Sequence, residues 1–204
     1  MTGITGGFGE EGIVSGQSYR SDDDALRLKV LETADRLYYT VGIQAVGMDT
    51  LRAEAGISLK RLYRLFPSKE SIVEQVLLRR HEMWNAMVED AVDVGDPRQR
   101  LLAIYDMLAR WFDQDDFRGC VFINSFGELG ASAPRVAEIV RAHKAAFQTR
   151  LAELVAEAGA PASLAPQLAI LAEGAQTTAA IAGTNDAAMQ ARGAAVVLID
   201  AALQ

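Results

Sequence analysis

The sequence predicts an all-α protein, on three observations. Apolar residues recur three and four positions apart along most of the chain after residue 24, which is the period of a helix with one buried face. No segment alternates convincingly like a strand, although Val121, Phe122 and Ile123 would also tolerate one. Residues 47–66 have the pattern of two short helices joined at Gly56, and the second of these is rich in cations.

Length and composition indicate a helical protein of one or two compact domains. A chain of 204 residues, half of them apolar, can bury a substantial core. We expect a disordered tail at residues 1–23, a helix-turn-helix domain at 24–68 and a helical body at 69–204. The chain has neither a run of about 18 apolar residues nor a secretory signal, so a cytoplasmic protein with no membrane span is expected. Cys120 is the single cysteine, which excludes an internal disulfide.

The first elements follow from composition and spacing. Residues 1–20 contain six glycines and few large apolar side chains, too little burial to offset the entropy of ordering. From Ala25 onward, apolar residues share one helical face as far as Gly42, which ends the first helix. The acidic residues 22–24 suit the positive end of that helix.

The paired short helices have the pattern of a DNA-reading module. Gly56 provides the positive φ that ends the first of them, and Ser58 caps the second. The second helix has one apolar face, which anchors it, and an opposite face that carries donors for phosphate oxygens and guanine edges. The apolar face is Leu62, Leu65 and Phe66, and the opposite face is Lys60, Arg61, Tyr63 and Arg64.

Charge is divided along the chain in a way that suits this module. The total is −7, but residues 1–24 carry −4, residues 25–84 carry +3 and residues 85–204 carry −6. A basic module on an acidic body concentrates phosphate attraction at one end of the molecule.

The body continues as helices. A long helix is expected from Ser68 to about Met87, another from Asp96-Pro97, and another from Pro134 to near Gly159. Two further helices follow, with caps at Ser163 and Asp186. These last helices are unusually rich in small residues, because residues 151–204 contain nineteen Ala and four Gly. Small side chains let helix backbones approach closely, so the last two helices are expected to form a dimer interface. Ordinary Ala-rich packing within one chain is the alternative.

These residues resemble the tetracycline-repressor (TetR) family of bacterial transcription regulators. The resemblance rests on residues 55–58 (Ala-Gly-Ile-Ser), 62–66 (Leu-Tyr-Arg-Leu-Phe) and 68–70 (Ser-Lys-Glu), and it covers roughly residues 25–75. A weaker likeness extends over residues 117–128. The resemblance implies about nine helices, a three-helix N-terminal DNA-binding domain, and a C-terminal domain that binds an effector and forms a homodimer through the last two helices.

The resemblance also implies roles for particular residues in binding double-stranded operator DNA. Tyr63 and Lys69 match positions that hold phosphates. Positions around the major groove are matched by Thr50, Ser58, Leu59, Lys60, Arg61 and Arg64. Lys60 and Arg61 replace smaller residues common in the family, and Arg52 stands where a small Ala is common. If Lys60 or Arg61 reaches base edges, the operator half-sites should contain guanine; contact with phosphate alone is the alternative.

An aromatic and methionine-rich set is expected to line an effector pocket for a small, largely apolar molecule, with Asn124 and His143 as its polar groups. Core packing alone is the alternative for each member. The set is Met83, Trp84, Met87, Met107, Trp111, Phe122, Asn124, Phe126, His143 and Phe147.

The expected function is ligand-responsive regulation of transcription by a homodimer, as a repressor that a small molecule releases from a palindromic operator. Activation, or a helical enzyme using the body cavity, is the alternative. No cofactor or metal is expected: the chain lacks a phosphate-binding loop, and two histidines with Cys120 are too few for a dedicated zinc site. Cys120 and His143 lack a local catalytic signature, so we do not expect an enzyme.

Overall fold

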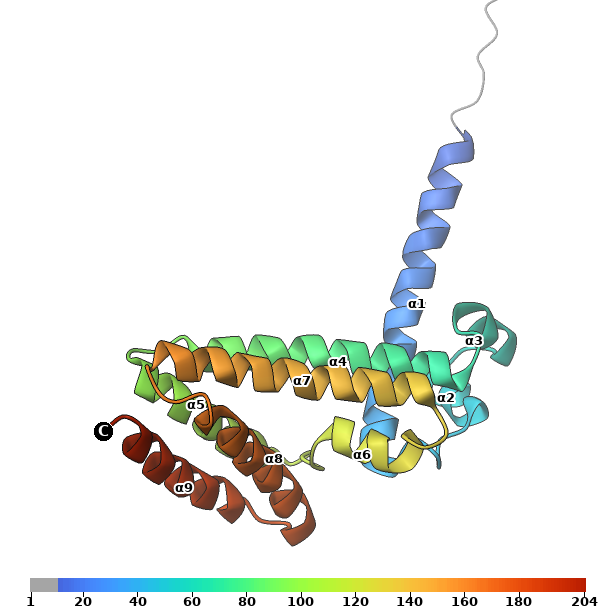
Figure 1. Cartoon of the computed structure of the whole chain (residues 1–204). Helices are drawn as coiled ribbons and strands as arrows, with labels where there is room; N and C mark the ends of the chain where they lie inside the picture. The colour runs from blue at the N-terminus through green and yellow to red at the C-terminus, as the bar shows by residue number, and fades with distance from the viewer. Residues whose placement is uncertain (1–10) are drawn as a thin grey trace, which may run out of the picture.

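The computed structural model describes residues 11–204, and within this part of the chain it contains nine α-helices and no strand. The predicted all-α class is confirmed, and residues 121–123 are helical. In chain order the helices are α1 (Glu11–Val41), α2 (Met48–Ala55), α3 (Leu59–Leu65), α4 (Lys69–Val92), α5 (Pro97–Phe112), α6 (Val121–Leu129), α7 (Pro134–Glu157), α8 (Leu164–Ala182) and α9 (Asp186–Ala202), as labelled in Figure 1.

Glycines and short polar residues end and begin these helices at the predicted places. Gly42, Gly56 and Gly183 adopt positive φ angles of 98°, 67° and 69°, which glycine reaches without strain from a Cβ. Asp96 accepts a hydrogen bond of 2.8 Å from the Gln99 N–H at the start of α5. Ser163 is the N-cap of α8 without a side-chain bond, and Asn185 rather than Asp186 is the N-cap of α9.

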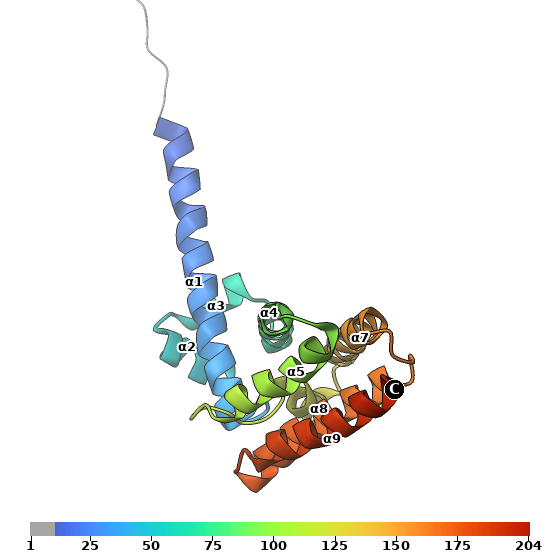
Figure 2. The ribbon, with the colours of Figure 1, turned by 90° about the vertical axis from the view of Figure 1, so that its left-hand side faces the viewer.

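The N-terminus of α1 differs from the predicted disordered tail. Residues 1–10 of that tail lie outside the described residues, and α1 begins at Glu11 rather than at Ala25. Adding a residue to an existing helix gains a hydrogen bond for each residue ordered, whereas nucleation is the costly step, so a helix anchored by packing extends readily. As a result α1 projects well beyond the other helices (Figures 1 and 2).

Helices α1–α3 pack on the first turns of α4. The shared core is apolar, and four of its aliphatic side chains are completely buried: Val30, Leu51, Leu62 and Ile72. We call α1–α3 the head. Because α4 contributes to this core and then continues into the rest of the molecule, its axis connects the head to the body.

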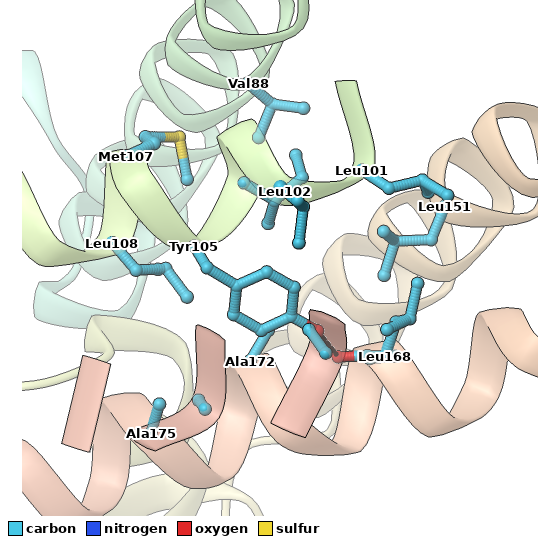
Figure 3. Close-up of a cluster of buried hydrophobic side chains, with 14 of the residues drawn as sticks. Val88, Leu101, Leu102, Tyr105, Met107, Leu108, Leu151, Leu168, Ala172 and Ala175 are labelled. Carbon is cyan, nitrogen blue, oxygen red and sulfur yellow. Dashed lines mark hydrogen bonds between the residues drawn. The ribbon is translucent and has the colours of Figure 1, made fainter. Parts of the chain in front are cut away.

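In the body, α4 and α7 lie side by side, and α8 and α9 form a pair on the side away from α2 and α3 (Figures 1 and 2). Tyr105 of α5 lies at the centre of the packing between these layers, and its hydroxyl donates a hydrogen bond of 2.8 Å to the Leu168 carbonyl of α8 (Figure 3). Burial raises the pKa of Tyr105, so its phenol stays protonated. Among the described helices, none combines the length and apolar character needed to cross a bilayer.

Candidate functional site

The turn between α2 and α3 presents α3 at the molecular surface. Gly56 turns the chain, and Ser58 then caps α3 by accepting a hydrogen bond of 3.2 Å from the Arg61 N–H. Leu62 and Leu65 are buried against α1 and α4, which fixes the rotation of α3 about its axis. The opposite face of the helix is therefore directed outward.

Most of the predicted DNA-binding residues are exposed, on the outward face of α3, at its N-cap or on α2. The side chains of Thr50, Ser58, Leu59, Lys60, Tyr63 and Arg64 are exposed. Two residues are more constrained. Arg61 forms an ion pair with Asp23 of α1, and Lys69 is half-buried, with its Nζ 3.5 Å from the Gln44 carbonyl oxygen. Burial lowers the pKa of Lys69, and the nearby Glu128 carboxylate opposes that effect.

Two contacts in the head were not predicted from the sequence. Arg52, whose packing the family pattern left in doubt, donates from Nε to Asp49 Oδ1 at 2.9 Å on the surface of α2. Asp23 was expected only to stabilise the N-terminus of the first helix, yet it contacts the cations of α3. This contact could not be predicted from the sequence. Asp23 and the cations of α3 are far apart in the chain and meet only because α1 passes next to α3.

A cavity of about 290 Å³ lies in the body next to the head. Six predicted pocket residues line it: Met83, Trp84, Met87, Trp111, Phe122 and His143. Six lining residues were missed: Tyr39, Arg80, Gln114, Asp116, Cys120 and Val121. Both tryptophans of the chain are thus in the wall. The wall is mostly aromatic and thioether surface, which suits a small, largely apolar molecule.

Four residues of the predicted pocket lie elsewhere. Met107 is buried in the body core (Figure 3), and Phe147 is buried on the far side of Trp84, edge-on to its ring. Phe126 is exposed beneath the Arg141 guanidinium, and the Asn124 amide donates to the Arg118 carbonyl oxygen at 3.1 Å. Helical spacing alone did not separate the cavity face of each helix from its core face.

His143 is the buried polar group of the cavity wall. It is 4% exposed, its ring is stacked on Phe122 with centroids 3.4 Å apart, and its Nδ1 lies 3.0 Å from Nδ1 of His81. Burial, followed by the charges of Lys144 and His81, lowers the pKa of His143 to about 3. The imidazole is therefore neutral at physiological pH.

The shifted pKa of His143 predicts a loss of stability in weak acid. An unfolded histidine binds a proton below about pH 6.5, whereas folded His143 does so only near pH 3, so unfolding takes up a proton between these values. This group alone should lower the free energy of unfolding by about 2 kcal/mol between pH 7.5 and pH 5. Urea unfolding of the wild type and His143→Gln at both pH values measures it. The variant should lose correspondingly less stability, and an equal loss in both proteins would contradict the assignment.

Cys120 is a buried free thiol in the cavity wall, and Lys144 Nζ lies 3.7 Å from its Sγ. No hydrogen bond joins Cys120 to His143 in the described part of the chain. The imidazole instead faces His81 and Phe122. The Cys120 thiol and the His143 imidazole are therefore not paired with each other among the described residues.

The cavity and the head share residues. Tyr39, near the end of α1, lines the cavity; its hydroxyl donates to the Gly119 carbonyl at 2.8 Å and accepts from the Arg118 N–H at 2.9 Å. The Arg80 guanidinium of α4 lies over the Tyr39 ring and pairs with Asp35 of α1 at 2.6 Å. A molecule in this cavity would therefore touch a residue of the head directly.

Helix α6 forms a second connection. Its first turn, with Val121 and Phe122, lines the cavity. Near its other end, Glu128 forms hydrogen bonds with the turn between α1 and α2. The Glu128 carboxylate accepts hydrogen bonds from the Ile43 and Gln44 N–H groups at 3.1 and 2.8 Å. The Gln44 side-chain amide donates to the Glu128 carbonyl at 2.6 Å. One short helix thus spans the distance from the cavity to the head.

Two family models match this architecture. "Bacterial regulatory proteins, tetR family" matches residues 30–76, and "Tetracyclin repressor-like, C-terminal domain" matches residues 97–195. The chain belongs to the TetR family. The resemblance drawn from the motifs at residues 55–70 is confirmed, and the second TetR-family match covers α5 to α8 and most of α9.

Two solved structures and one sequence relative are similar to this chain. A regulator of Streptomyces coelicolor has 25% identity and a TM-score of 0.83, covering 88% of this chain and 96% of its own. One from Streptomyces avermitilis has 28% identity and a TM-score of 0.77, covering 87% and 97%. An uncharacterized HTH-type transcriptional regulator of Mycobacterium tuberculosis (strain H37Rv) is 25% identical over 124 residues, 60% of this chain. The match spans 61% of that relative's length.

Proposed function

We propose that this protein is a ligand-responsive transcriptional regulator, a repressor that binds a palindromic operator as a homodimer and leaves it when a small molecule occupies the body cavity. The observation that carries the proposal is the outward face of α3, where Lys60, Tyr63 and Arg64 are exposed on a helix fixed by buried leucines. Such a helix suits the major groove, with phosphate contacts that position it and base contacts that give specificity.

Exposed apolar residues on α8 and α9 support the homodimer. Ile170, Gly174 and Ile181 recur along one face of α8, and Met189 and Val197 along one face of α9; the four large side chains are exposed. A Cβ added at Gly174 would meet no atom of the described chain within 4 Å. A partner's helices could approach closely there and bury this surface. Pairing of α8 and α9 with their copies would hold two α3 helices about 34 Å apart, one helical turn of DNA.

We infer that the cavity controls the spacing of the heads through α4 and α6. A ligand between Trp84, Trp111 and Phe122 contacts both helices, and each helix also contacts the head, α4 through its buried first turns and α6 through Glu128. A ligand that binds more tightly to one separation of the heads would shift the protein towards that separation. Operator affinity would change by the ratio of the two ligand affinities, typically about 5- to 150-fold.

Operator binding with and without a cavity ligand tests the function. The operator is first selected from random DNA. Because both tryptophans line the cavity, compounds that quench the intrinsic fluorescence identify ligands without knowledge of the natural effector. At least one quenching compound should weaken operator binding. Salt-dependent operator binding that no cavity ligand alters would contradict ligand control while leaving DNA binding intact.

Glu128→Ala should uncouple the cavity from the head. The variant loses the acceptor for the Ile43 and Gln44 N–H groups and keeps the bond from the Gln44 side chain to the backbone carbonyl of residue 128, so movement of α6 reaches the α1–α2 turn more weakly. A compound should still quench its fluorescence at the wild-type concentration, while its effect on operator affinity falls several-fold towards none. Glu138→Ala, which removes an exposed carboxylate of α7 that pairs with Arg135 on the same helix, is the matched control. Full ligand response in Glu128→Ala would exclude this route.

A further inference from the structure

An acidic side chain of α1 contacts two of the cations on the proposed DNA-binding helix. Asp23 Oδ1 accepts a hydrogen bond from Arg61 Nη2, and Arg64 Nη2 lies 3.6 Å from the same oxygen. The Arg61 and Asp23 side chains are 31% and 38% exposed, so water screens the contact only in part. The flanking residues Asp22 and Asp24 form no ion pair in the part of the chain that the structure describes.

The contact with Asp23 limits which cations of α3 are free to bind DNA. With Arg61 held against α1, Lys60 and Arg64 are the cations most available to a phosphate, and Arg64 is itself attracted to Asp23. The Arg61 Nε atom is buried without a partner among the described residues. A guanidinium with an unsatisfied donor gains hydrogen bonds by swinging out to DNA, and the partly exposed ion pair that holds it is weak.

Specific and non-specific DNA respond differently to this competition. A guanine edge offers Arg61 two acceptors in a fixed geometry, which outweighs a weak ion pair. Non-specific DNA offers mainly single phosphate contacts, whose attraction depends on the number of free cations. Freeing Arg61 costs the operator complex the full free energy of the ion pair, whereas a non-specific complex can leave the pair intact. Asp23 therefore lowers operator affinity at least as much as affinity for random DNA.

We propose that Asp23 is a restraining residue of the DNA-binding surface, which holds Arg61 and partly neutralises Arg64 so that DNA must displace it to recruit these cations. The proposal rests on the function proposed above, in which α3 reads DNA. It assigns control of DNA affinity to a residue outside the helix-turn-helix itself.

The test is Asp23→Asn in the full-length chain, with Asp24→Asn as the matched control. Asp24 is an exposed neighbour, so its substitution makes the same change in net charge without removing the ion pair. Two fluorescein-labelled 24-bp duplexes are titrated across a series of salt concentrations, one of random sequence and one carrying the selected operator. Asp23→Asn should bind the random duplex roughly three- to tenfold more tightly at low salt, with a salt slope steeper by about one to two. Operator affinity should rise by at least the same factor, because the operator complex no longer has to break the ion pair to free Arg61.

A double variant shows whether Asp23 acts through Arg61. In an Arg61→Ala background, Asp23→Asn should lose most of its effect on the random duplex, because the cation that it releases is gone. Equal effects of Asp23→Asn and Asp24→Asn would overturn the proposal, since net charge alone would then explain both. Weaker operator binding by Asp23→Asn, with unchanged random binding, would also overturn it. If the wild type bound neither duplex, the proposed function itself would fail, a result distinct from these.

Discussion

Replacing Ile181 and Val197 with glutamate should convert the protein to a monomer and lower operator affinity by about two to four orders of magnitude. These side chains are 83% and 67% exposed and lie on the proposed dimer faces of α8 and α9. In a symmetric dimer each charge would be buried in both protomers, which is unfavourable without a partner. A monomer then binds one half-site and loses the gain from binding two linked sites on one duplex.

Sedimentation velocity measures the oligomeric state of this variant, and titration of the selected operator measures its affinity. Val94→Glu is the matched control, because Val94 is an exposed apolar residue in the turn between α4 and α5 and is not part of α8 or α9. It should leave both properties unchanged. A wild type that sediments as a monomer, or an Ile181→Glu/Val197→Glu variant that remains dimeric, would contradict the assigned interface.

Lys60→Ala should weaken operator binding by about 2 to 6 kcal/mol if Lys60 reads a base, because each good base contact discriminates by about 1 to 3 kcal/mol and the dimer makes it twice. This corresponds to about 30-fold or more in affinity. Lys60 is exposed, and no ion pair holds its side chain in the described part of the chain, so it is free to reach the groove. The half-sites should contain guanine for it to contact.

Operators with and without the guanine distinguish a base contact of Lys60 from a phosphate contact. If Lys60 contacts guanine, replacing that guanine with adenine in both half-sites should remove most of the difference between the wild type and Lys60→Ala. A phosphate contact would weaken all duplexes about equally and reduce the salt slope. Arg36→Ala, which removes an exposed cation of α1 paired with Glu54, is the control for charge in the head. Half-sites without guanine in the reading window would reject the hypothesis.

Local chemistry made the helices and the outward face of α3 predictable from sequence. Gly56 and Ser58 end one helix and begin the next through their own backbone and side-chain atoms, and Leu62 sets which face is buried. These signals lie within a few residues of the feature that they determine. The helices predicted to start at Ser68 and Asp96 were found for the same reason, with these residues as their N-caps.

Long-range placement made the rest unpredictable. Tyr39 lies in the cavity wall because α1 packs against α4 and the loop before α6. On its own helix Tyr39 follows the polar residues Glu32, Asp35 and Arg36, so the sequence pattern does not mark it as buried. Arg80 could not be predicted as a cavity residue from sequence. Its position in the wall depends on its ion pair with Asp35 and its contact with the Tyr39 ring. Glu128 and Asp23 act on segments 84 and 38 residues away, and periodicity carries no information at those separations.

The central claim is that the outward face of α3, held in register by a dimer, binds DNA through its cations. The salt dependence of affinity for the selected operator tests it most directly. The logarithm of the association constant should fall linearly with the logarithm of salt concentration, with a slope of about −0.9 for each phosphate contact, and two protomers should bind each operator. An affinity that does not change with salt would contradict the claim.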